Sequence, residues 1–269
     1  MPTNFRQLLQ SLAPVLASSG HKGQAGRIAV IGGCQSYTGA PYFAAITTMK
    51  LGTDLTTVYC TDDAGTPIKS YSPDLMVDPI LHTSNVENKS YSDVINQITS
   101  MIKRCNSVII GCGLGKNTYV QKQVIDIIKY TIDNKIPLVI DGDGLSIIND
   151  HIELIHNTTQ CIITPNAMEF YRLYKSVFPD KPDPPMNVEI DDKMKHDYLQ
   201  HNHRIDGDLI ECDSSTAQHT AELARALGNI TIVRKGQIDL ITNGMQAVFC
   251  CSRGGLKRVG GQGDVTAGM

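Results

Sequence analysis

Short apolar runs alternate with longer stretches of helical periodicity along most of the chain. The apolar runs contain few polar positions, which is typical of strands in a parallel sheet that helices cover on both faces. The predicted strands are 27–31, 56–60, 107–110, 137–141, 161–164 and 230–234, and the predicted helices lie near 41–51, 91–104, 118–134, 167–176 and 215–227. This order predicts an α/β fold, a three-layer α/β/α sandwich with a mostly parallel central sheet and right-handed crossovers.

Two features modify this simple alternation. Asn243-Gly244 separates strand-like runs at 239–242 and 246–251, so an antiparallel hairpin is expected near the C-terminus. Residues 179–213 interrupt the alternation of strands and helices: this segment contains four prolines, ten acidic residues and four basic residues. The histidines of this segment, His196, His201 and His203, would allow a metal site. They lack helical spacing, and an acidic, flexible surface insertion in one domain over 1–269 is favoured.

Composition excludes several classes of function. The chain has 269 residues, of which 41% are hydrophobic and 19% are charged, and its apolar runs are too short to span a bilayer. The formal charge is −3 and no long Lys/Arg run occurs, so neither a membrane nor a nucleic acid is an expected partner. Outside the acidic segment, the rest of the chain contains 20 basic and 17 acidic residues. That balance suits an anionic small ligand, and equally no partner at all.

The eight cysteines form no Cys-x-x-Cys pair, so zinc ribbons and thioredoxin-like motifs are unsupported. Most lie in apolar runs, as buried free thiols do, which favours a reducing compartment. The first 20 residues have one arginine, three serines and no acid, a weak transit-peptide composition. We therefore expect a cytoplasmic protein, with the mitochondrion as a second location.

Three turns that follow predicted strands could face a ligand. The turn at 32–41 is rich in glycine but matches neither the dinucleotide fingerprint nor the P-loop. The turn at 111–115 ends a strand at the edge where open α/β sheets bind ligands. The third turn contains Asp141 and Asp143, whose carboxylates could face a ligand or metal, or could equally cap the next helix.

Two further motifs carry sharper signals. Asn166 and Glu169 have capping-box spacing, and with Arg172 they could also form a polar cluster for phosphate and hydrated Mg²⁺. Gly260-Gly261-Gln262-Gly263-Asp264 precedes an apolar, helix-like segment. Its backbone amides would form an anion-binding nest, beside which Asp264 could take a proton during phosphoryl transfer. The alternative is a glycine-rich turn in which Asp264 is only the N-cap.

Together the motifs resemble those of the ribokinase-like superfamily, and within it the ATP-dependent NAD(P)H-hydrate dehydratase family. The resemblance implies a ribokinase-like sandwich and covers the chain from about residue 20 onward, apart from the acidic segment. Cys112 stands where the family often has proline. The matching stretches are Lys22-Gly23-Gln24-x-Gly26-Arg27, Tyr37-Thr38-Gly39-Ala40-Pro41, Lys69-Ser70-Tyr71-Ser72-Pro73, Gly113-Leu114-Gly115, Asp141-x-Asp143-Gly144-Leu145, Thr164-Pro165-Asn166-x-x-Glu169-Phe170, Lys235-Gly236 and Gly260-Gly261-Gln262-Gly263-Asp264.

The resemblance implies a carbon–oxygen lyase. ATP would phosphorylate the ring hydroxyl of the S form of hydrated NADH or NADPH (NADHX, NADPHX), with Mg²⁺ as cofactor. Loss of phosphate would then restore NAD(P)H, leaving ADP and phosphate as the other products. It also implies a functional pairing with NAD(P)H-hydrate epimerase and allows an oligomer.

The resemblance also assigns residues to these roles. Asp264 would be the general base, and Asn166 and Glu169 would organise Mg²⁺ through water. The substrate-binding residues would be Ala40, Gly113, Asn166, Ala167, Met168, Glu169, Phe170, Tyr171, Arg172 and Asp264. The ATP-binding residues would be Lys235, Gly236, Gln237, Ile238, Asp239, Gly254, Gly255, Leu256, Lys257, Arg258, Val259, Gly260, Gly261, Gln262 and Gly263.

Two alternatives remain, and one departure bears on them. A ribokinase-like vitamin or sugar kinase would keep its phosphorylated product, and a non-catalytic form would bind nucleotide without turnover. Only Val265–Met269 follow Asp264, whereas the family continues through further helices. A helix of that length is too short to be stable alone. We therefore expect a chain that is incomplete at its C-terminus and impaired in activity as it stands.

Overall fold

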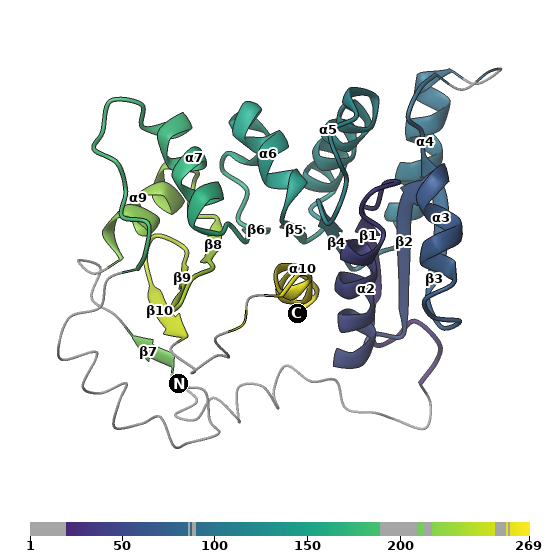
Figure 1. Cartoon of the computed structure of the whole chain (residues 1–269), viewed down its shortest axis with the longest axis horizontal. Coiled ribbons are helices and arrows are strands. Elements are labelled where there is room, and N and C mark those ends of the chain that lie inside the picture. The colour runs from purple at the N-terminus through teal and green to yellow at the C-terminus, as the bar shows by residue number, and fades with distance from the viewer. Residues whose placement is uncertain are drawn as a thin grey trace.

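The structure is a computed structural model that describes residues 20–85, 87, 90–188, 209–211, 217–250, 257 and 259–269. Its strands form one ten-stranded sheet in the order β3-β2-β1-β4-β5-β6-β8-β9-β10-β7 (Figure 1). Neighbours from β3 to β8 are parallel, and β9, β10 and β7 extend the sheet in antiparallel pairs. The strands are β1 (Arg27–Ile31), β2 (Leu55–Thr61), β3 (Met76–Leu81), β4 (Ser107–Ile110), β5 (Leu138–Ile140), β6 (Cys161–Ile163), β7 (Leu209–Glu211), β8 (Thr231–Arg234), β9 (Asp239–Thr242) and β10 (Ala247–Cys250).

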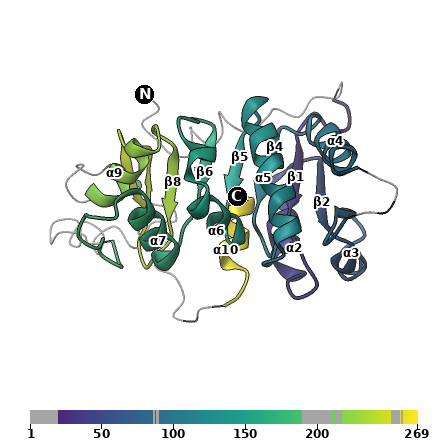
Figure 2. The same ribbon diagram turned by 90° about the horizontal axis from the view of Figure 1, so that it is seen from above.

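Helices cover both faces of this sheet (Figure 2). One face carries α4 (Tyr91–Ile102), α5 (Thr118–Asp133), α6 (Asp143–Asp150), α7 (Ala167–Val177) and α9 (Gln218–Ala226), with the short 3₁₀ helix η1 (Ile152–Ile155) after α6. The other face carries α2 (Gly39–Leu51), α3 (Asp62–Lys69) and α10 (Gln262–Gly268). The predicted three-layer sandwich with a mostly parallel sheet and a terminal antiparallel hairpin is confirmed.

Side-chain alternation within single strands explains the two covered faces. In β1, Ala29 and Ile31 lie in the larger hydrophobic core, whereas Val30 lies in the smaller core on the opposite face. All three side chains are fully buried. When helices cover both faces of a strand, its consecutive residues are all buried and form a continuous apolar run in the sequence. This is why these strands could be predicted.

The edge strand β3 and the helix before it were not predicted. Asp78 and Pro79 interrupt the apolar pattern of β3, and a proline within a strand is tolerated chiefly at a sheet edge. Helix α3 contains Gly65 and Pro67, which weaken its helical signal. Gly65 packs directly against the Pro79 ring, so the two irregular elements fit one another.

The described residues of the acidic segment lie against the rest of the domain. Lys175 Nζ donates hydrogen bonds to the carbonyl oxygens of Pro179 (2.9 Å) and Lys181 (2.8 Å), and Arg234 donates to that of Pro185. Farther along, β7 pairs with β10. The prediction of a loop over 179–213 is therefore wrong for residues 209–211, because they complete the sheet. His196, His201 and His203 lie outside the described residues, so the metal alternative stays a prediction.

Two expectations from composition concern the whole chain. Among the described residues, no helix has the length and the continuous apolar surface that a transmembrane span requires. Six of the eight cysteines fall in that part, and all six are free thiols. The N-terminal 19 residues and their weak transit-peptide composition lie outside the described residues.

Candidate active site

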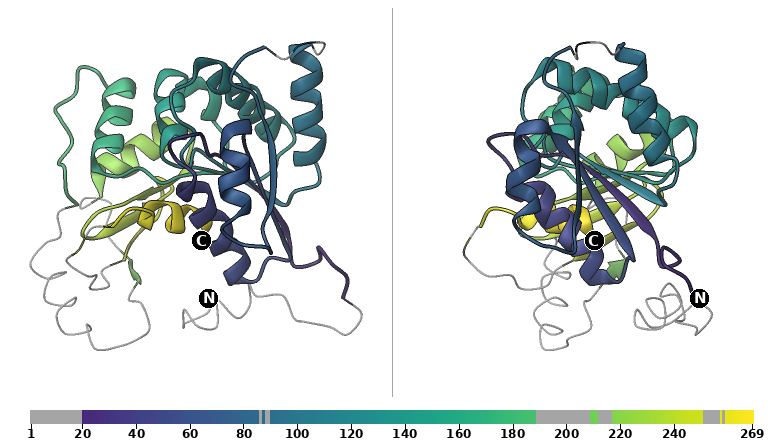
Figure 3. Two further views of the ribbon diagram at one scale, coloured as in Figure 1. Left: turned by 45° about the vertical axis from the view of Figure 1, so that its right-hand side comes forward. Right: turned by 90° about the vertical axis from the view of Figure 1, so that its right-hand side faces the viewer.

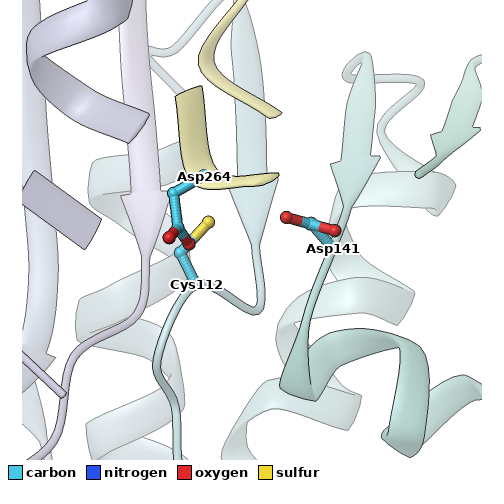
Figure 4. A group of neighbouring side chains, drawn as sticks. All are labelled: Cys112, Asp141 and Asp264. Carbon is cyan, nitrogen blue, oxygen red and sulfur yellow. The ribbon is translucent and has the colours of Figure 1, made fainter. Parts of the chain in front are cut away.

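Three polar side chains from different elements meet beyond the carboxyl ends of β4 and β5. Cys112 follows β4, Asp141 follows β5, and Asp264 lies in the first turn of α10 (Figure 4). The Cys112 sulfur and one carboxylate oxygen from each aspartate all lie within 4.8 Å of one another. The sequence predicts a site role for Asp264 and, as an alternative, for Asp141, but it predicts none for Cys112.

Close backbone packing fixes two of these residues. Gly111 has a φ of +121°, and a Cβ there would overlap the carbonyl oxygen of Asp141. The turns after β4 and β5 can therefore approach this closely only with glycine at 111. This close approach holds Cys112 and Asp141 on two turns that face each other.

Asp141 is the centre of a buried polar network. Its side chain is 4% exposed, and its Oδ1 atom accepts hydrogen bonds from Lys235 Nζ (2.6 Å) and Thr164 Oγ1 (2.7 Å). The Lys235 amide in turn donates to the Pro165 carbonyl oxygen at 2.8 Å. The network thus joins the ends of β5, β6 and β8. A buried charge needs such an opposite charge and hydrogen bonds to offset its desolvation.

Asp264 lies at the border between this network and solvent. Burial raises the pKa of the Asp264 carboxyl, the hydrogen bond from the Cys112 thiol lowers it, the negative charge of Asp141 raises it and Lys235 lowers it, with a net rise. Burial and the two nearby carboxylates keep the pKa of Cys112 well above its usual value, so it is a neutral thiol donor. A carboxylate with a raised pKa beside a fixed cation is suited to act as a general base.

The helix that carries Asp264 is short and is held by packing. Helix α10 lies against α2 (Figure 3), and a Cβ on Gly268 would overlap the Ala44 carbonyl oxygen. Helices too short to be stable alone are stabilised by such tertiary contacts. As expected from the sequence, the residues after Asp264 are too few for a helix that is stable alone, and α10 forms because α2 supports it.

Asn166 and Glu169 form the capping box that their spacing predicts. Asn166 Oδ1 accepts from the amides of Met168 and Glu169, both at 3.0 Å, and Glu169 Oε2 accepts from the Asn166 amide at 2.8 Å. Burial raises the pKa of Glu169, and among its charged neighbours Lys235 and Arg172 lower it while Asp141 raises it. Glu169 therefore lies within electrostatic reach of the Asp141 network, and capping does not exclude a role in the site.

The rest of the predicted substrate-binding stretch divides by exposure. Met168 and Arg172 are exposed, Ala167 is half-buried, and Tyr171 is half-buried with its hydroxyl donating to Asp183 at 3.3 Å. Phe170 is fully buried, and its ring lies 4.0 Å from the Arg234 guanidinium carbon. The Phe170 side chain is thus part of the hydrophobic core.

Gly113 and Ala40, two predicted substrate-binding residues that lie far apart in the sequence, are neighbours in the structure. A Cβ on Gly113 would lie 3.2 Å from the Ala40 Cβ and 2.8 Å from the Tyr37 carbonyl oxygen, and Gly113 has a φ of +66°. The next turn is fixed by Asp143, whose carboxylate accepts a hydrogen bond from the Gly115 amide at 2.8 Å. Asp143 therefore has a local structural role.

The predicted ATP-binding residues fall on two segments. Lys235 belongs to the Asp141 network, and Gly236 donates its amide to Asp239 Oδ1 at 2.8 Å in the turn between β8 and β9. That turn includes Gln237 and the half-buried Ile238. A Cβ on Gly263 would lie 3.1 Å from Lys235 Nζ, so the second segment reaches the first there. Of the second segment, Lys257, Val259, Gly260, Gly261, Gln262 and Gly263 are described, and Gly254, Gly255, Leu256 and Arg258 lie outside the described residues.

Comparison with solved structures defines the class of the fold. A ribokinase-like superfamily protein from Enterococcus faecalis superposes with a TM-score of 0.69 at 20% identity, covering 98% of this chain and 76% of that one. The ADP/ATP-dependent NAD(P)H-hydrate dehydratase of Bacillus subtilis, co-crystallised with ATP/Mg²⁺, gives 0.56 at 17% identity, covering 95% and 74%. At these identities the likeness shows the fold alone, which is ribokinase-like.

Sequence comparison identifies the family. The pattern of the NAD(P)H-hydrate dehydratase family matches residues 28–269. The ATP-dependent (S)-NAD(P)H-hydrate dehydratases of Mus musculus and Arabidopsis thaliana are each 38% identical over 265 and 269 residues, which cover 98% and 97% of this chain. That of Emericella nidulans is 40% identical over 266 residues, 97% of this chain. The chain belongs to the NAD(P)H-hydrate dehydratase family. It spans 66% of the length of the mouse and Arabidopsis relatives.

Proposed function

We propose that the protein catalyses the ATP-dependent dehydration of the S form of hydrated NADH and NADPH, releasing ADP and phosphate. The observation that carries the proposal is the Asp264 carboxylate, whose pKa is raised and which lies beside the Asp141–Lys235 pair at the ligand-binding edge of the sheet. The proposal is further supported by membership of a family whose matching relatives carry this activity in their names.

Asp264 would act on the hydroxyl of the hydrated nicotinamide ring. It takes the hydroxyl proton as the oxygen attacks the γ-phosphorus of ATP, and ADP leaves. The phosphate ester is a better leaving group than the hydroxyl, so the ring carbon–oxygen bond then breaks. Loss of a proton from the neighbouring ring carbon restores the double bond. The protein contributes mainly by positioning and electrostatics, as is general for phosphoryl transfer.

Lys235 supplies a fixed positive charge for the phosphates of ATP. Its ammonium is held by Asp141 and directed toward Gly263, in the second of the two proposed ATP-binding segments. An ammonium held by a buried carboxylate keeps its place without the cost of reorganisation during the reaction. ATP would thus lie between the turn after β8 and the glycine-rich approach to α10.

Glu169 and Asn166 would hold Mg²⁺ through water, and the ion would neutralise charge on the phosphates. These residues fit such an ion because the capping-box hydrogen bond from the Asn166 amide uses one Glu169 carboxylate oxygen, Oε2, and the carboxylate has a second oxygen. Oxygen donors of this kind are those that Mg²⁺ prefers, and it commonly keeps several waters. Pairing with NAD(P)H-hydrate epimerase, an oligomeric state and a cytoplasmic or mitochondrial location complete the proposal.

A coupled measurement tests this function. The purified chain is mixed with NADHX, ATP and Mg²⁺, and the absorbance of restored NADH is followed together with inorganic phosphate. Equal amounts of NADH, ADP and phosphate are expected. A stable phosphate ester without NADH would instead identify a kinase, and ATP binding without any product would identify a non-catalytic form. The rate also tests the expectation that this chain is impaired.

A further inference from the structure

We propose that Cys112, Asp141 and Asp264 form a site for a thiophilic divalent cation such as Zn²⁺, and that Zn²⁺ bound there stops turnover. The first half of the proposal stands on geometry and ligand chemistry alone. The second half rests on the proposed function, because it requires Asp264 to be the base.

The three ligand atoms already lie near the positions that a zinc ion needs. They are within 4.8 Å of one another and come from three separate elements, two of them fixed by packed turns. A tetrahedral ion with Zn–S of about 2.3 Å and Zn–O of about 2.0 Å holds its ligands roughly 3.3–3.6 Å apart. Small side-chain rotations, chiefly of the half-buried Asp264, would bring the three ligand atoms from separations of up to 4.8 Å to this tetrahedral spacing.

Asp141 can serve as a ligand without giving up its lysine. Its Oδ1 atom accepts from both Lys235 and Thr164, whereas its Oδ2 atom lies toward α10, 3.6 Å from where a Cβ on Gly263 would be. Within the described part of the chain, no hydrogen bond ends on Oδ2. A cation between α10 and this oxygen would leave the ion pair intact.

The charges of the cluster favour a cation. Among the described residues of this cluster, the carboxylates of Asp141 and Asp264 lie near one ammonium, that of Lys235, which leaves one net negative charge in a space between buried and half-buried. A divalent ion that displaces the thiol proton of Cys112 brings the cluster to zero: three negative ligands balance the ion and Lys235. Buried charges are retained when they are compensated in this way or when they coordinate a metal.

The sulfur ligand decides which cation would bind. Thiolate selects soft or borderline ions such as Zn²⁺ and Cd²⁺, whereas Mg²⁺ requires oxygen ligands in octahedral geometry. The proposed Mg²⁺ position at Asn166 and Glu169 has only oxygen donors. The two kinds of ion are therefore separated by ligand chemistry, and Mg²⁺ would not compete at Cys112.

Titration with CdCl₂ tests the site directly, because a sulfur-to-cadmium charge-transfer band reports thiolate ligation without any turnover. We expect one tight Cd²⁺ per chain, unaffected by excess MgCl₂. Cys112→Ser and Asp264→Asn should each weaken binding at least about 100-fold, as losing even an outer-shell partner costs 10–100-fold. Cys34→Ser is the matched control, since this half-buried thiol lies beside Gly115 at the same edge of the sheet, and it should bind Cd²⁺ like the parent chain.

A tight band that persists in Cys112→Ser, or that Cys34→Ser removes, would overturn the site. Circular dichroism shows whether each variant is folded, and Asp264→Asn, which changes a half-buried side chain, decides the question if Cys112→Ser does not fold. Zn²⁺ should also inhibit NADHX dehydration, reversed by a chelator and weakened in Cys112→Ser relative to that variant's own uninhibited rate. Cd²⁺ binding without any turnover in the absence of cation would refute the proposed function and leave the cation site standing.

Discussion

Asp264 and Asp141 are two carboxylates of one site with different surroundings. Asp141 is enclosed and its Oδ1 atom is committed to Lys235 and Thr164, so it fixes the positive charge of the site. Within the described part of the chain, the Asp264 carboxylate accepts hydrogen bonds from the Cys112 thiol and from its own backbone amide, but from no ammonium. The first carboxylate is therefore suited to hold charge in place, and the second to exchange a proton.

Asp264→Asn should abolish turnover while leaving ATP binding nearly unchanged. The amide keeps the size of the side chain and can still accept from Cys112, but it cannot take a proton. A positioned base typically contributes about 10²–10⁴ in rate. Rates of NADHX dehydration and ATP affinity by calorimetry measure the two effects. A loss below tenfold would remove Asp264 from the role of base.

The same variant should be more stable than the parent chain at neutral pH. The pKa of Asp264 is raised above the usual 3.8, so folding favours the protonated carboxyl. That contribution is present at low pH and is lost as pH rises through the folded-state value. The excess stability of Asp264→Asn should therefore be small near pH 4 and grow toward pH 7, measured by urea unfolding at several pH values. An excess that shrinks with rising pH would contradict this assignment.

At the scale of elements, the site depends on how α10 lies against α2. Only Ala267 and Gly268 of α10 are buried, and they meet the α2 face that contains Ala44 and Thr47. A seven-residue helix has little stability of its own, so this contact places Asp264.

Gly268→Ala should detach or displace α10. Its Cβ would overlap the Ala44 carbonyl oxygen and lie 2.9 Å from the Thr47 Cβ, and overpacking of this kind costs about 1–3 kcal/mol. We expect a lower free energy of unfolding and a lower rate of turnover. Gly260→Ala is the stability control, because a Cβ there meets no atom within 4 Å. Equal unfolding free energies for the two variants would show that the α10–α2 contact does not matter.

At the scale of the molecule, Arg234 connects parts that are distant in sequence. Its guanidinium is nearly fully buried, lies over the Phe170 ring, and donates to the Pro185 carbonyl oxygen and to Thr220 Oγ1 at 3.3 Å. Burial lowers the pKa of Arg234 to about 10. One side chain of β8 thus joins α7, α9 and the start of the acidic segment.

Arg234→Met should destabilise the whole domain. It keeps much of the apolar contact with Phe170 but leaves the half-buried Pro185 carbonyl oxygen and the buried Thr220 hydroxyl without their donor, and an unsatisfied buried polar group costs about 1–3 kcal/mol. Chemical denaturation measures the loss. Arg104→Met, at an exposed position, is the matched control and should stay within about 0.5 kcal/mol of the parent chain. An Arg234→Met chain as stable as this control would contradict the bridging role.

Features that depend on a short stretch of residues could be predicted from the sequence, whereas features that depend on residues far apart in the chain could not. The double-sided burial of β1 and β4 and the capping box of Asn166 are written into short stretches, so they could be read directly. The Asp141–Lys235 pair joins residues 94 positions apart, and its existence depends on β5, β6 and β8 being neighbours in the sheet. Cys112 was missed for the same reason, because a thiol gains its role only from the turn that faces it.

The irregular edge strand β3 also has a consequence for association between molecules. An edge strand offers unpaired backbone groups to any other strand, and long regular edges promote aggregation. Here Pro79 removes one donor from the edge, Asp78 places a charge beside it, and the register against β2 shifts between Tyr59 and Thr61. These features oppose the addition of a further strand, so this side of the sheet is protected against stacking into intermolecular β-structure.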